Sequence, residues 1–394
     1  MKYQNIIDNM TLKEKAAFLS GKSEWQTRDF PRLDIPAIFC SDGPNGVRKQ
    51  AGAGDHLGIN PAVPATCFPT AAAMANSWDE ELEQRVGVAL GEESMEEDVN
   101  VLLGPGLNIK RNPLCGRNFE YFSEDPYLSG KMAAAFIRGV QSTGAAACAK
   151  HFAVNSQELR RMAMNAVVDE RTLREIYLTG FEIAIKEGGA KTVMSSYNEV
   201  NGVYANENEH LLKDILRDEW GFEGSVITDW GASNDHSLGV KNGSTLEMPT
   251  PGLDAARELL ASVESGKISE KDIDERVDEL LDLVLTTTEN AKHYKKVADK
   301  KALHEEHHKL ARLACENSAV LLKNEDGILP VGAKVQAAII GDFAFDPRYQ
   351  GAGSSMVNST KVDSIKDMLK TSGISVTGIV RGYQRDGKED ETMK

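Results

Sequence analysis

The sequence predicts an α/β fold: a TIM-type (β/α) barrel followed by the beginning of an α/β sandwich domain. Apolar, strand-like runs alternate with helical patterns over roughly the first 250 residues, a length typical of one such barrel. Nearly every run ends on a polar or charged residue. A further strand-like run at residues 335–340 then starts a second α/β unit. Because the carboxyl ends of barrel strands meet at one rim, these polar ends are expected to gather there.

The elements of the predicted barrel follow one another along the chain. Thr11 and Glu14 form a capping-box pattern that opens a first helix. Strands are expected at residues 37–40, 101–103, 145–149, 192–196 and 244–248, and in the run that ends on Asp229. Helices are expected at residues 78–97, 131–141, 171–187, 211–220, 253–265 and 269–286.

Three parts are predicted along the 394 residues. Residues 1–288 form the catalytic barrel, residues 289–330 a linker and an amphipathic helix at 304–323, and residues 331–394 the N-terminal part of an incomplete sandwich domain. The linker is marked by a shift to Lys, Asn, Thr and Ala. The second unit has barely begun where the sequence reaches its final residues, KEDETMK.

Composition restricts the class of partner. The formal net charge of −15 and the scarcity of Lys and Arg clusters exclude a surface for nucleic acid or for an anionic membrane. No apolar window approaches 18 residues and no signal-peptide pattern opens the chain, so a cytoplasmic protein is expected. The five cysteines lack paired spacing, which predicts reduced thiols rather than disulfides or a zinc site.

Two features indicate where chemistry is placed. Asp229 ends a β-branched run, either as a carboxylate at the rim of the barrel or as a cap of the next helix. The stretch 104–130 is rich in Gly, Pro and Asn, so a long loop is expected, and such loops in compact domains are usually functional. Its acidic residues Glu120, Glu124 and Asp125 are better explained as ion pairs or caps at the surface than as site residues.

Five segments in this order resemble glycoside hydrolase family 3, in particular its β-glucosidase-type members. They read SDGPNGVR, GPGLNIKRNPLCGRNFEYFSEDP, AKHFAVNSQE, VMSSYN and VITDW. The resemblance covers essentially the whole chain and implies that Asp229 is the catalytic nucleophile. It implies the following substrate-binding residues: Asp42, Arg117, Lys150, His151, Arg161, Met194, Tyr197, Trp230 and Ser354. A sugar pocket needs carboxylates, cationic donors and an aromatic face, because each hydroxyl both donates and accepts, and this set provides them.

The resemblance implies a retaining glycosidase that removes terminal non-reducing β-D-glucosyl residues from β-glucosides or oligosaccharides, without a cofactor or metal. Its acid/base is a Glu expected outside this chain, in a C-terminal polypeptide that completes the second domain. Another branch of the family uses an Asp-His pair after the strand that carries Lys150, but the segment FAVNSQELRRM lacks that pair.

Other interpretations stay open from the sequence. The chain is alternatively a β-xylosidase or other exo-glycosidase of the family, a sugar-binding fragment without turnover, or a Schiff-base aldolase using Lys150. The HEEHH sequence at 304–308 matches a zinc-protease pattern but is expected to be a solvated helix face. The GAGSS sequence at 351–355 lacks the third glycine of a dinucleotide site.

Overall fold

A parallel sheet forms the centre of the computed structural model, which describes residues 1–52, 54, 60–332 and 335–383. Five strands lie in the order β1, β3, β4, β6 and β9, all parallel. Their bounds are Cys40–Asp42, Val101–Leu103, Ala146–Phe152, Thr192–Ser195 and Ser225–Ile227. This order follows the chain, as in a barrel built from successive β/α units.

Single bridges continue the sheet into a ring. Ile227 at the end of β9 pairs in parallel with Leu246, and Glu247 pairs in parallel with Ser20. Gln26 then pairs with Phe39, just before β1, in the antiparallel sense. The expected strand at 244–248 is therefore present only as these bridges among the described residues. The fold is a TIM-type barrel with an irregular closing side.

Inward and outward side chains alternate along the strands. In β4, Ala146 and Cys148 belong to the apolar cluster inside the ring, whereas Ala147 and Ala149 belong to the cluster beneath the outer helices. This alternation is the two-residue period of an extended strand. It also means that a residue two positions after an inward-facing one faces inward again.

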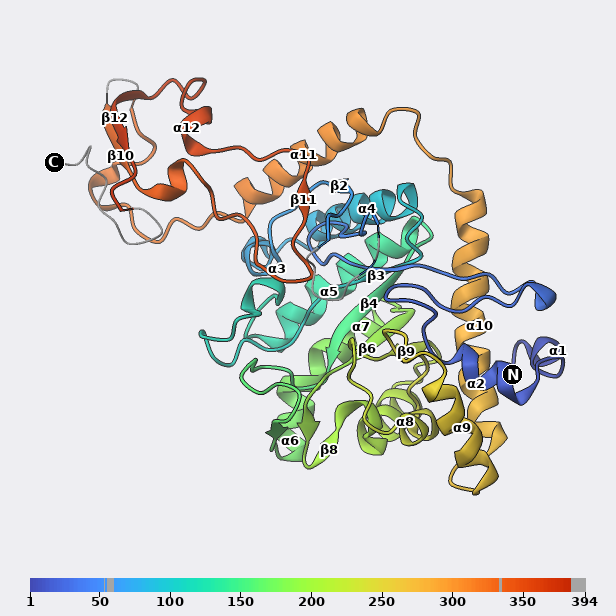
Figure 1. Cartoon of the computed structure of the whole chain (residues 1–394). Helices are drawn as coiled ribbons and strands as arrows, with labels where there is room; N and C mark the ends of the chain where they lie inside the picture. Colours follow the sequence, from blue (N-terminus) through green and yellow to red (C-terminus); the bar gives the residue numbers. More distant parts are fainter. Residues whose placement is uncertain (53, 55–59, 333–334, 384–394) are drawn as a thin grey trace.

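Helices surround this sheet (Figure 1). Those around the barrel are α1 (Gln4–Ile7), α2 (Leu12–Phe18), α3 (Ala71–Met74), α4 (Glu80–Glu96), α5 (Pro126–Ser142), α6 (Glu170–Thr172), α7 (Thr179–Lys186), α8 (His236–Asn242), α9 (Asp254–Glu264) and α10 (Glu270–His293). Two wider π-helical segments complete this layer, at Leu173–Leu178 and His210–Glu219. The capping box of Thr11 and Glu14 is present at the start of α2, as predicted.

Several element boundaries differ from those expected. The first strand begins at Cys40 instead of ending there, and β4 extends through Phe152, so Lys150 and His151 lie inside it. Helix α5 begins at Pro126, five residues early, because Asp125 caps it and a proline is well suited to the first helical position. The predicted domain boundary at 288/289 lies inside α10.

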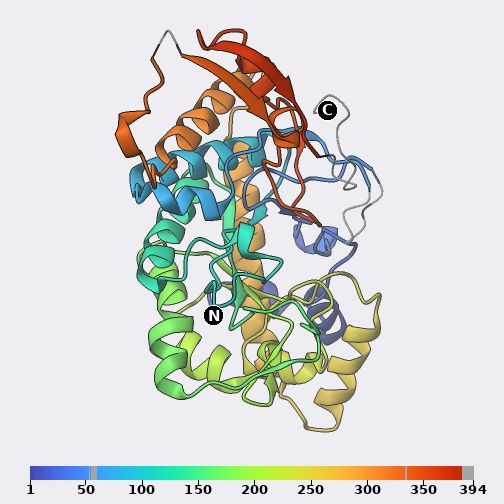
Figure 2. The same cartoon turned by 90° about the vertical axis from the view of Figure 1, so that its left-hand side faces the viewer.

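The remaining segment packs on one end of the barrel. Helix α11 (Lys300–Asn317) lies along α4, and both views place it there (Figures 1 and 2). It begins at Lys300, capped by Asp299, and ends at Asn317, so it is shifted toward the N-terminus relative to the expected 304–323. Beyond it, β10 (Gln336–Ile340) and β12 (Ser375–Val380) form a two-stranded parallel sheet near α12 (Ile365–Met368), which agrees with a second α/β unit starting near residue 335.

One stretch of this segment returns to the barrel. Residues 348–359, which we call the strap, end in β11 (Asn358–Ser359), and β11 pairs in parallel with β2 (Pro64–Ala65). Val357 of the strap is buried in the barrel cluster beside Gly46. The final residues 384–394, which include the sequence KEDETMK, lie outside the described residues.

A three-stranded sheet of β5 (Asn165–Ala166), β7 (Glu199–Val200) and β8 (Val203–Tyr204) lies outside the ring. None of the helices in the described part of the chain is long and apolar enough to cross a membrane.

Candidate active site

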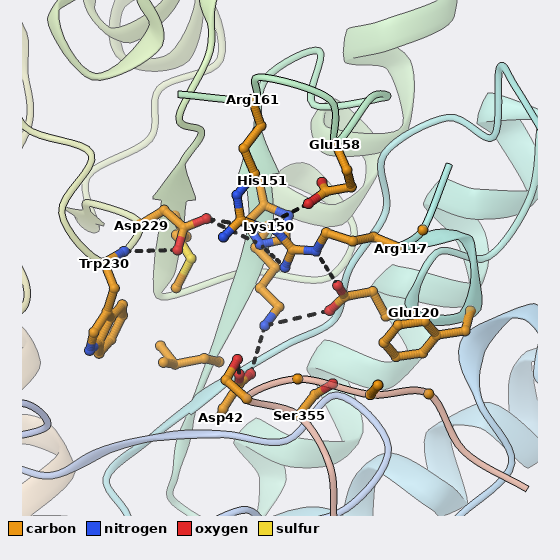
Figure 3. Close-up of a pocket in the computed structure, with 18 of the residues that line it drawn as sticks. Asp42, Arg117, Glu120, Lys150, His151, Glu158, Arg161, Asp229, Trp230 and Ser355 are labelled. Carbon is orange, nitrogen blue, oxygen red and sulfur yellow. Dashed lines mark hydrogen bonds and ion pairs between the residues drawn. The ribbon is translucent and has the colours of Figure 1, made fainter. Parts of the chain in front are cut away.

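A cavity of about 630 Å³ opens at the carboxyl ends of the barrel strands. All ten residues that the family resemblance implied line it: Asp42, Arg117, Lys150, His151, Arg161, Met194, Tyr197, Asp229, Trp230 and Ser354. In Figure 3 the side chains of Asp42, Glu120 and Asp229 point from three sides toward Lys150 and Arg117. The cavity volume is within the range of small-molecule sites.

The alternation of the strands explains this convergence. Asp42 follows the inward-facing Cys40 by two residues, and Lys150 follows Cys148 in the same way. Asp229 stands two residues beyond the inward-facing Ile227, just past the end of β9. Each polar side chain therefore continues the inner face of its strand at the rim, where the apolar interior ends.

Lys150 and Asp42 form a buried ion pair. The Lys150 ammonium lies 2.8 Å from Asp42 Oδ1, and the Ser354 hydroxyl of the strap donates to Oδ2 at 2.5 Å. Burial alone would raise the pKa of Asp42, but the Lys150 charge and these hydrogen bonds hold it below its usual value. Burial alone would lower the pKa of Lys150, but Asp42 and Glu120 raise it. Both groups are charged at neutral pH.

This charge state disfavours the aldolase interpretation. A lysine that forms a Schiff base must supply a neutral amine, usually through a depressed pKa. The pKa of Lys150 is instead raised, and its nitrogen is paired with Asp42.

Glu120 joins a second cation to the same network. Its Oε1 accepts from Arg117 Nε at 2.5 Å, and its Oε2 lies 3.8 Å from the Lys150 nitrogen. Glu120 is 3% exposed, so the expectation of a surface ion pair is wrong for this residue. Asp125, in contrast, caps α5 as that interpretation held, and Glu124 is exposed.

His151 is held in its neutral form. Burial, together with the charges of Arg117 and Lys150, lowers its pKa well below the ordinary value. Arg117 can only donate, so His151 Nε2, at 2.7 Å from Arg117 Nη2, accepts, and the ring proton is on Nδ1. The Nδ1 atom lies 3.3 Å from Asn108 Oδ1, which fixes the ring.

Asp229 has one carboxylate oxygen without a hydrogen-bond partner among the described residues. It is buried at 8% exposure, and Oδ2 has no hydrogen-bond partner in the described structure. Arg117 Nη1 and His151 Nε2 lie 3.9 and 3.6 Å from Oδ2, while Oδ1 accepts from the backbone of Trp230 at 2.8 Å. Burial raises the pKa of Asp229, although Arg117 and Lys150 act in the opposite direction.

Two tryptophans form one wall of the cavity. The Trp230 ring lies against Trp25 with 4.9 Å between ring centroids, and its Nε1 donates to the carbonyl of Glu24. No pattern in the sequence around Trp25 indicates this contact. An aromatic face beside a carboxylate is what a pyranose ring requires on its apolar side.

Glu158 and Phe119 line the cavity although they were not predicted as part of the site. Glu158 and Arg161 lie on the loop after β4, with Arg161 Nη1 2.8 Å from Glu158 Oε2. The Arg161 guanidinium lies over the Tyr197 ring, 4.5 Å from its centroid. Phe119 of the long loop also lines the cavity and contacts Gly351 of the strap, where an added Cβ would lie 2.4 Å from the ring.

The expected solvated face of the HEEHH segment holds for Glu305 and Glu306, which are exposed, but is wrong for His307. His307 is 5% exposed, and its Nδ1 lies 2.7 Å from Glu93 and its Nε2 3.0 Å from Glu92. These carboxylates on α4 fix α11 to the barrel. No group of three or more metal-ligating side chains occurs among the described residues.

Comparison with known proteins decides the family. The family model described as "Glycosyl hydrolase family 3 N terminal domain" matches residues 22–283. The chain belongs to glycosyl hydrolase family 3. The resemblance inferred from five short segments is therefore confirmed, as is the barrel fold.

Relatives within family 3 extend along nearly the whole chain. The chain is 49% identical to "Thermostable beta-glucosidase B" of Acetivibrio thermocellus, over 99% of its own length and 52% of the relative. It is 43% identical to an "Exo-alpha-(1->6)-L-arabinopyranosidase" of Bifidobacterium breve, over 93% and 49%. A crystal structure of a Bifidobacterium adolescentis β-glucosidase superposes with a TM-score of 0.89 at 41% identity, over 98% of this chain and 55% of that one. The chain thus spans about half the length of the relatives it matches.

Proposed function

We propose that this chain is the catalytic barrel of a retaining β-glucosidase that releases terminal non-reducing β-D-glucosyl residues. The observation that carries the proposal is Asp229, whose Oδ2 is buried at the cavity and has no hydrogen-bond partner in the described structure. A nucleophilic oxygen has to be free to form a bond. Membership of family 3 and the names of the β-glucosidase relatives support this assignment.

In the proposed mechanism, Asp229 Oδ2 attacks the anomeric carbon and forms a glycosyl ester as the bond to the leaving oxygen breaks. The leaving oxygen takes a proton from a general acid. Water then attacks the same carbon, gives its proton to that residue as base, and releases Asp229 with the sugar in the β configuration. Burial raises the pKa of Asp229, which makes its ionised form less stable and more reactive. The positive charge of Arg117 acts in the opposite direction and favours the ionised form at neutral pH.

The charged side chains around Asp229 would bind the sugar hydroxyls. Asp42 and Glu120 would accept hydrogen bonds from the hydroxyls, and Lys150 and Arg117 would donate hydrogen bonds to them. Neutral His151 would contact the hydroxyls beside these groups without transferring a proton. Such a site discriminates strongly against sugars that lack a hydroxyl, because buried polar groups are then left unpaired. Trp230 would pack on the apolar face of the ring.

We place the general acid outside these residues. The other carboxylates at the cavity are each tied to a cation: Asp42 to Lys150, Glu120 to Arg117 and Glu158 to Arg161. An acid must carry a proton, whereas a guanidinium or ammonium partner favours the carboxylate form. A Glu on a polypeptide that completes the second unit would fill this role. Without it, the chain would bind sugar and react only with activated glucosides.

A second candidate is removal of α-L-arabinopyranosyl residues, the activity named for the relative that is 43% identical. β-Xylosidase activity is the corresponding alternative for a pentose lacking the hydroxymethyl group. A panel of 2,4-dinitrophenyl glycosides of the three sugars would rank them. Higher kcat/KM with the arabinopyranoside or the xyloside than with the glucoside would replace the first candidate by the corresponding activity.

Proton NMR of the product tests the retaining mechanism. Hydrolysis of 2,4-dinitrophenyl β-D-glucoside, whose leaving group needs little protonation, should release β-glucose first, followed by slow mutarotation. Release of α-glucose first would require inversion and would exclude Asp229 as a nucleophile.

A further inference from the structure

The loop after β4 carries an ion pair at the edge of the cavity whose role the mechanism above leaves unassigned. Arg161 Nη1 lies 2.8 Å from Glu158 Oε2, and the two side chains are 35% and 25% exposed. The backbone nitrogen of Arg161 also donates to the carbonyl of Glu158 at 3.2 Å. Both contacts thus lie within a single turn of the loop, and both residues line the cavity.

Contacts lead from this pair to the nucleophile. The Arg161 guanidinium lies over the ring of Tyr197, 4.5 Å from its centroid, and the Tyr197 hydroxyl donates to the carbonyl of Trp230 at 2.9 Å. The Arg161 charge acts on Asp229 and on His151. Arg161 is therefore close enough to influence the ionisation of Asp229.

Glu158 is the carboxylate that pairs with Arg161 among the described residues. Without it, the partly exposed Arg161 would share the cavity with the like charges of Lys150 and Arg117 and would be free to turn toward solvent. The remaining oxygen, Glu158 Oε1, is buried and has no hydrogen-bond partner in the described structure. A buried carboxylate oxygen without a partner is costly and is retained where the geometry is needed for another purpose.

From these contacts, and on the basis of the proposed function, we infer that Glu158 is a positioning residue: it fixes Arg161 over Tyr197, so that the guanidinium faces the substrate next to the carbon attacked by Asp229. Glu158 acts through Arg161 and transfers no proton. The polar substrate atoms next to that carbon are the ring oxygen, the leaving oxygen and the 2-hydroxyl, so Arg161 is directed at the part of the sugar where charge changes during the reaction.

Three variants test this role: Glu158→Gln, Glu158→Ala and, as a matched control, Glu175→Ala. Glu175 pairs with Arg171 in an exposed ion pair away from the cavity. The reagent is 2,4-dinitrophenyl 2-deoxy-2-fluoro-β-D-glucoside, which labels the nucleophile without needing a general acid. The labelling rate is followed from pH 4 to pH 8, and glucose binding is followed by the fluorescence of the cavity tryptophans.

The two Glu158 variants are expected to differ in labelling rate. Glutamine keeps an acceptor for Arg161, so labelling should stay within about threefold of wild type, since only part of one charge-assisted hydrogen bond is lost. Alanine frees Arg161, so labelling should slow by about tenfold or more, and the acid limb should move to higher pH because Asp229 loses a nearby positive charge. Glu175→Ala should match wild type.

Different results would contradict the positioning role of Glu158 and the proposed function. Equal labelling by Glu158→Ala and wild type would overturn the positioning role. Equal loss in both Glu158 variants with an activated substrate, restored by azide, would make Glu158 a proton-transfer group and overturn it as well. Absence of any label on the wild-type chain would instead count against the proposed function. In that case glucose affinity decides the inference, because an unchanged dissociation constant in Glu158→Ala would overturn it.

Discussion

The Ser354 hydroxyl donates to Asp42 Oδ2 at 2.5 Å, although the two residues are 312 positions apart in the chain. The bond joins the strap to the first strand of the barrel at the cavity. Because Asp42 also pairs with Lys150, the strap contributes directly to the group that is proposed to bind sugar hydroxyls. The second unit thus takes part in the barrel's site.

Replacing Ser354 by alanine should weaken sugar binding. Loss of a hydrogen bond to a charged acceptor costs about 1.5 kcal/mol, equal to about a tenfold increase in the dissociation constant for glucose. Ser359→Ala is the matched control, since its hydroxyl contacts Tyr349 in the same strap and lies away from the cavity. Titration calorimetry giving the same affinity for both variants would show that the strap contact is dispensable.

A side chain at Gly351 should displace the strap. The nearest atoms of the Phe119 ring lie 2.4 Å from the position of an added Cβ, too close for any real contact. Gly351→Ala is therefore expected to raise the dissociation constant for glucose more than Ser354→Ala does. Gly378→Ala, where an added Cβ meets nothing within 4 Å, should leave binding unchanged. Full affinity in the Gly351 variant would mean that the strap adjusts without affecting the cavity.

The acid limb of Asp229 labelling should lie above the pH expected for an exposed aspartate, about 3.9, because burial raises the pKa of Asp229. Arg117 opposes this shift, so Arg117→Met should move the limb to still higher pH. The exposed neighbour Arg111 provides the control, Arg111→Met, which should leave the midpoint in place. A limb that moved downward in Arg117→Met would contradict the electrostatic assignment.

His307 and Glu93 should stabilise the packing of α11 on α4 in a pH-dependent way. Burial would lower the pKa of His307, but the hydrogen bonds that it donates to Glu92 and Glu93 raise it to about 9. Burial would raise the pKa of Glu93, but the hydrogen bonds from His304, His307 and Thr66 lower it to about 2. The histidine contribution is fully present below its unfolded pKa of about 6.5 and is lost as pH rises through about 9. The glutamate contribution is present above about 4.5 and is lost toward pH 2.

Breaking this buried pair with His307→Ala should lower the free energy of unfolding by about 3–5 kcal/mol at pH 7. The difference from wild type should shrink as pH rises above about 6.5 and should be smallest above about pH 9. His293→Ala removes an exposed pair with Glu289 and should change stability by less than about 1 kcal/mol. Urea denaturation at several pH values measures both, and a pH-independent difference would indicate lost packing rather than lost charge.

Much of the barrel could be predicted because its strands carry the information locally. The strand Val101–Leu103 was placed to the residue, and the polar residues after the strand cores marked the rim where Asp42 and Asp229 converge. Side chains alternate between the two faces of a strand, so these polar residues face inward even where the predicted strand boundary is wrong by a few residues. The errors at β1 and β4 therefore moved no site residue out of the cavity.

The features that sequence reasoning missed depend on partners distant in the chain. Trp25 gains its role from Trp230, 205 positions later, and no periodicity reports such a contact. The HEEHH segment looked like a solvated face because its charges are visible in the sequence, whereas Glu92 and Glu93, which neutralise and bury His307, lie on another helix. Glu120 was assigned to the surface because its charge is visible in the sequence, whereas its burial beside Lys150 of another strand is not.

The most direct measurement is the site of covalent labelling. The chain is treated with 2,4-dinitrophenyl 2-deoxy-2-fluoro-β-D-glucoside, digested and analysed by mass spectrometry, beside Asp229→Asn as the unreactive control. Asp229→Asn should fold at least as stably as wild type, since it removes a buried carboxylate whose raised pKa reflects a cost of ionisation. The account predicts one fluoroglucosyl group per chain, on Asp229, and none on the variant. A label on Asp42, Glu120 or Glu158, or undiminished labelling of Asp229→Asn, would contradict it.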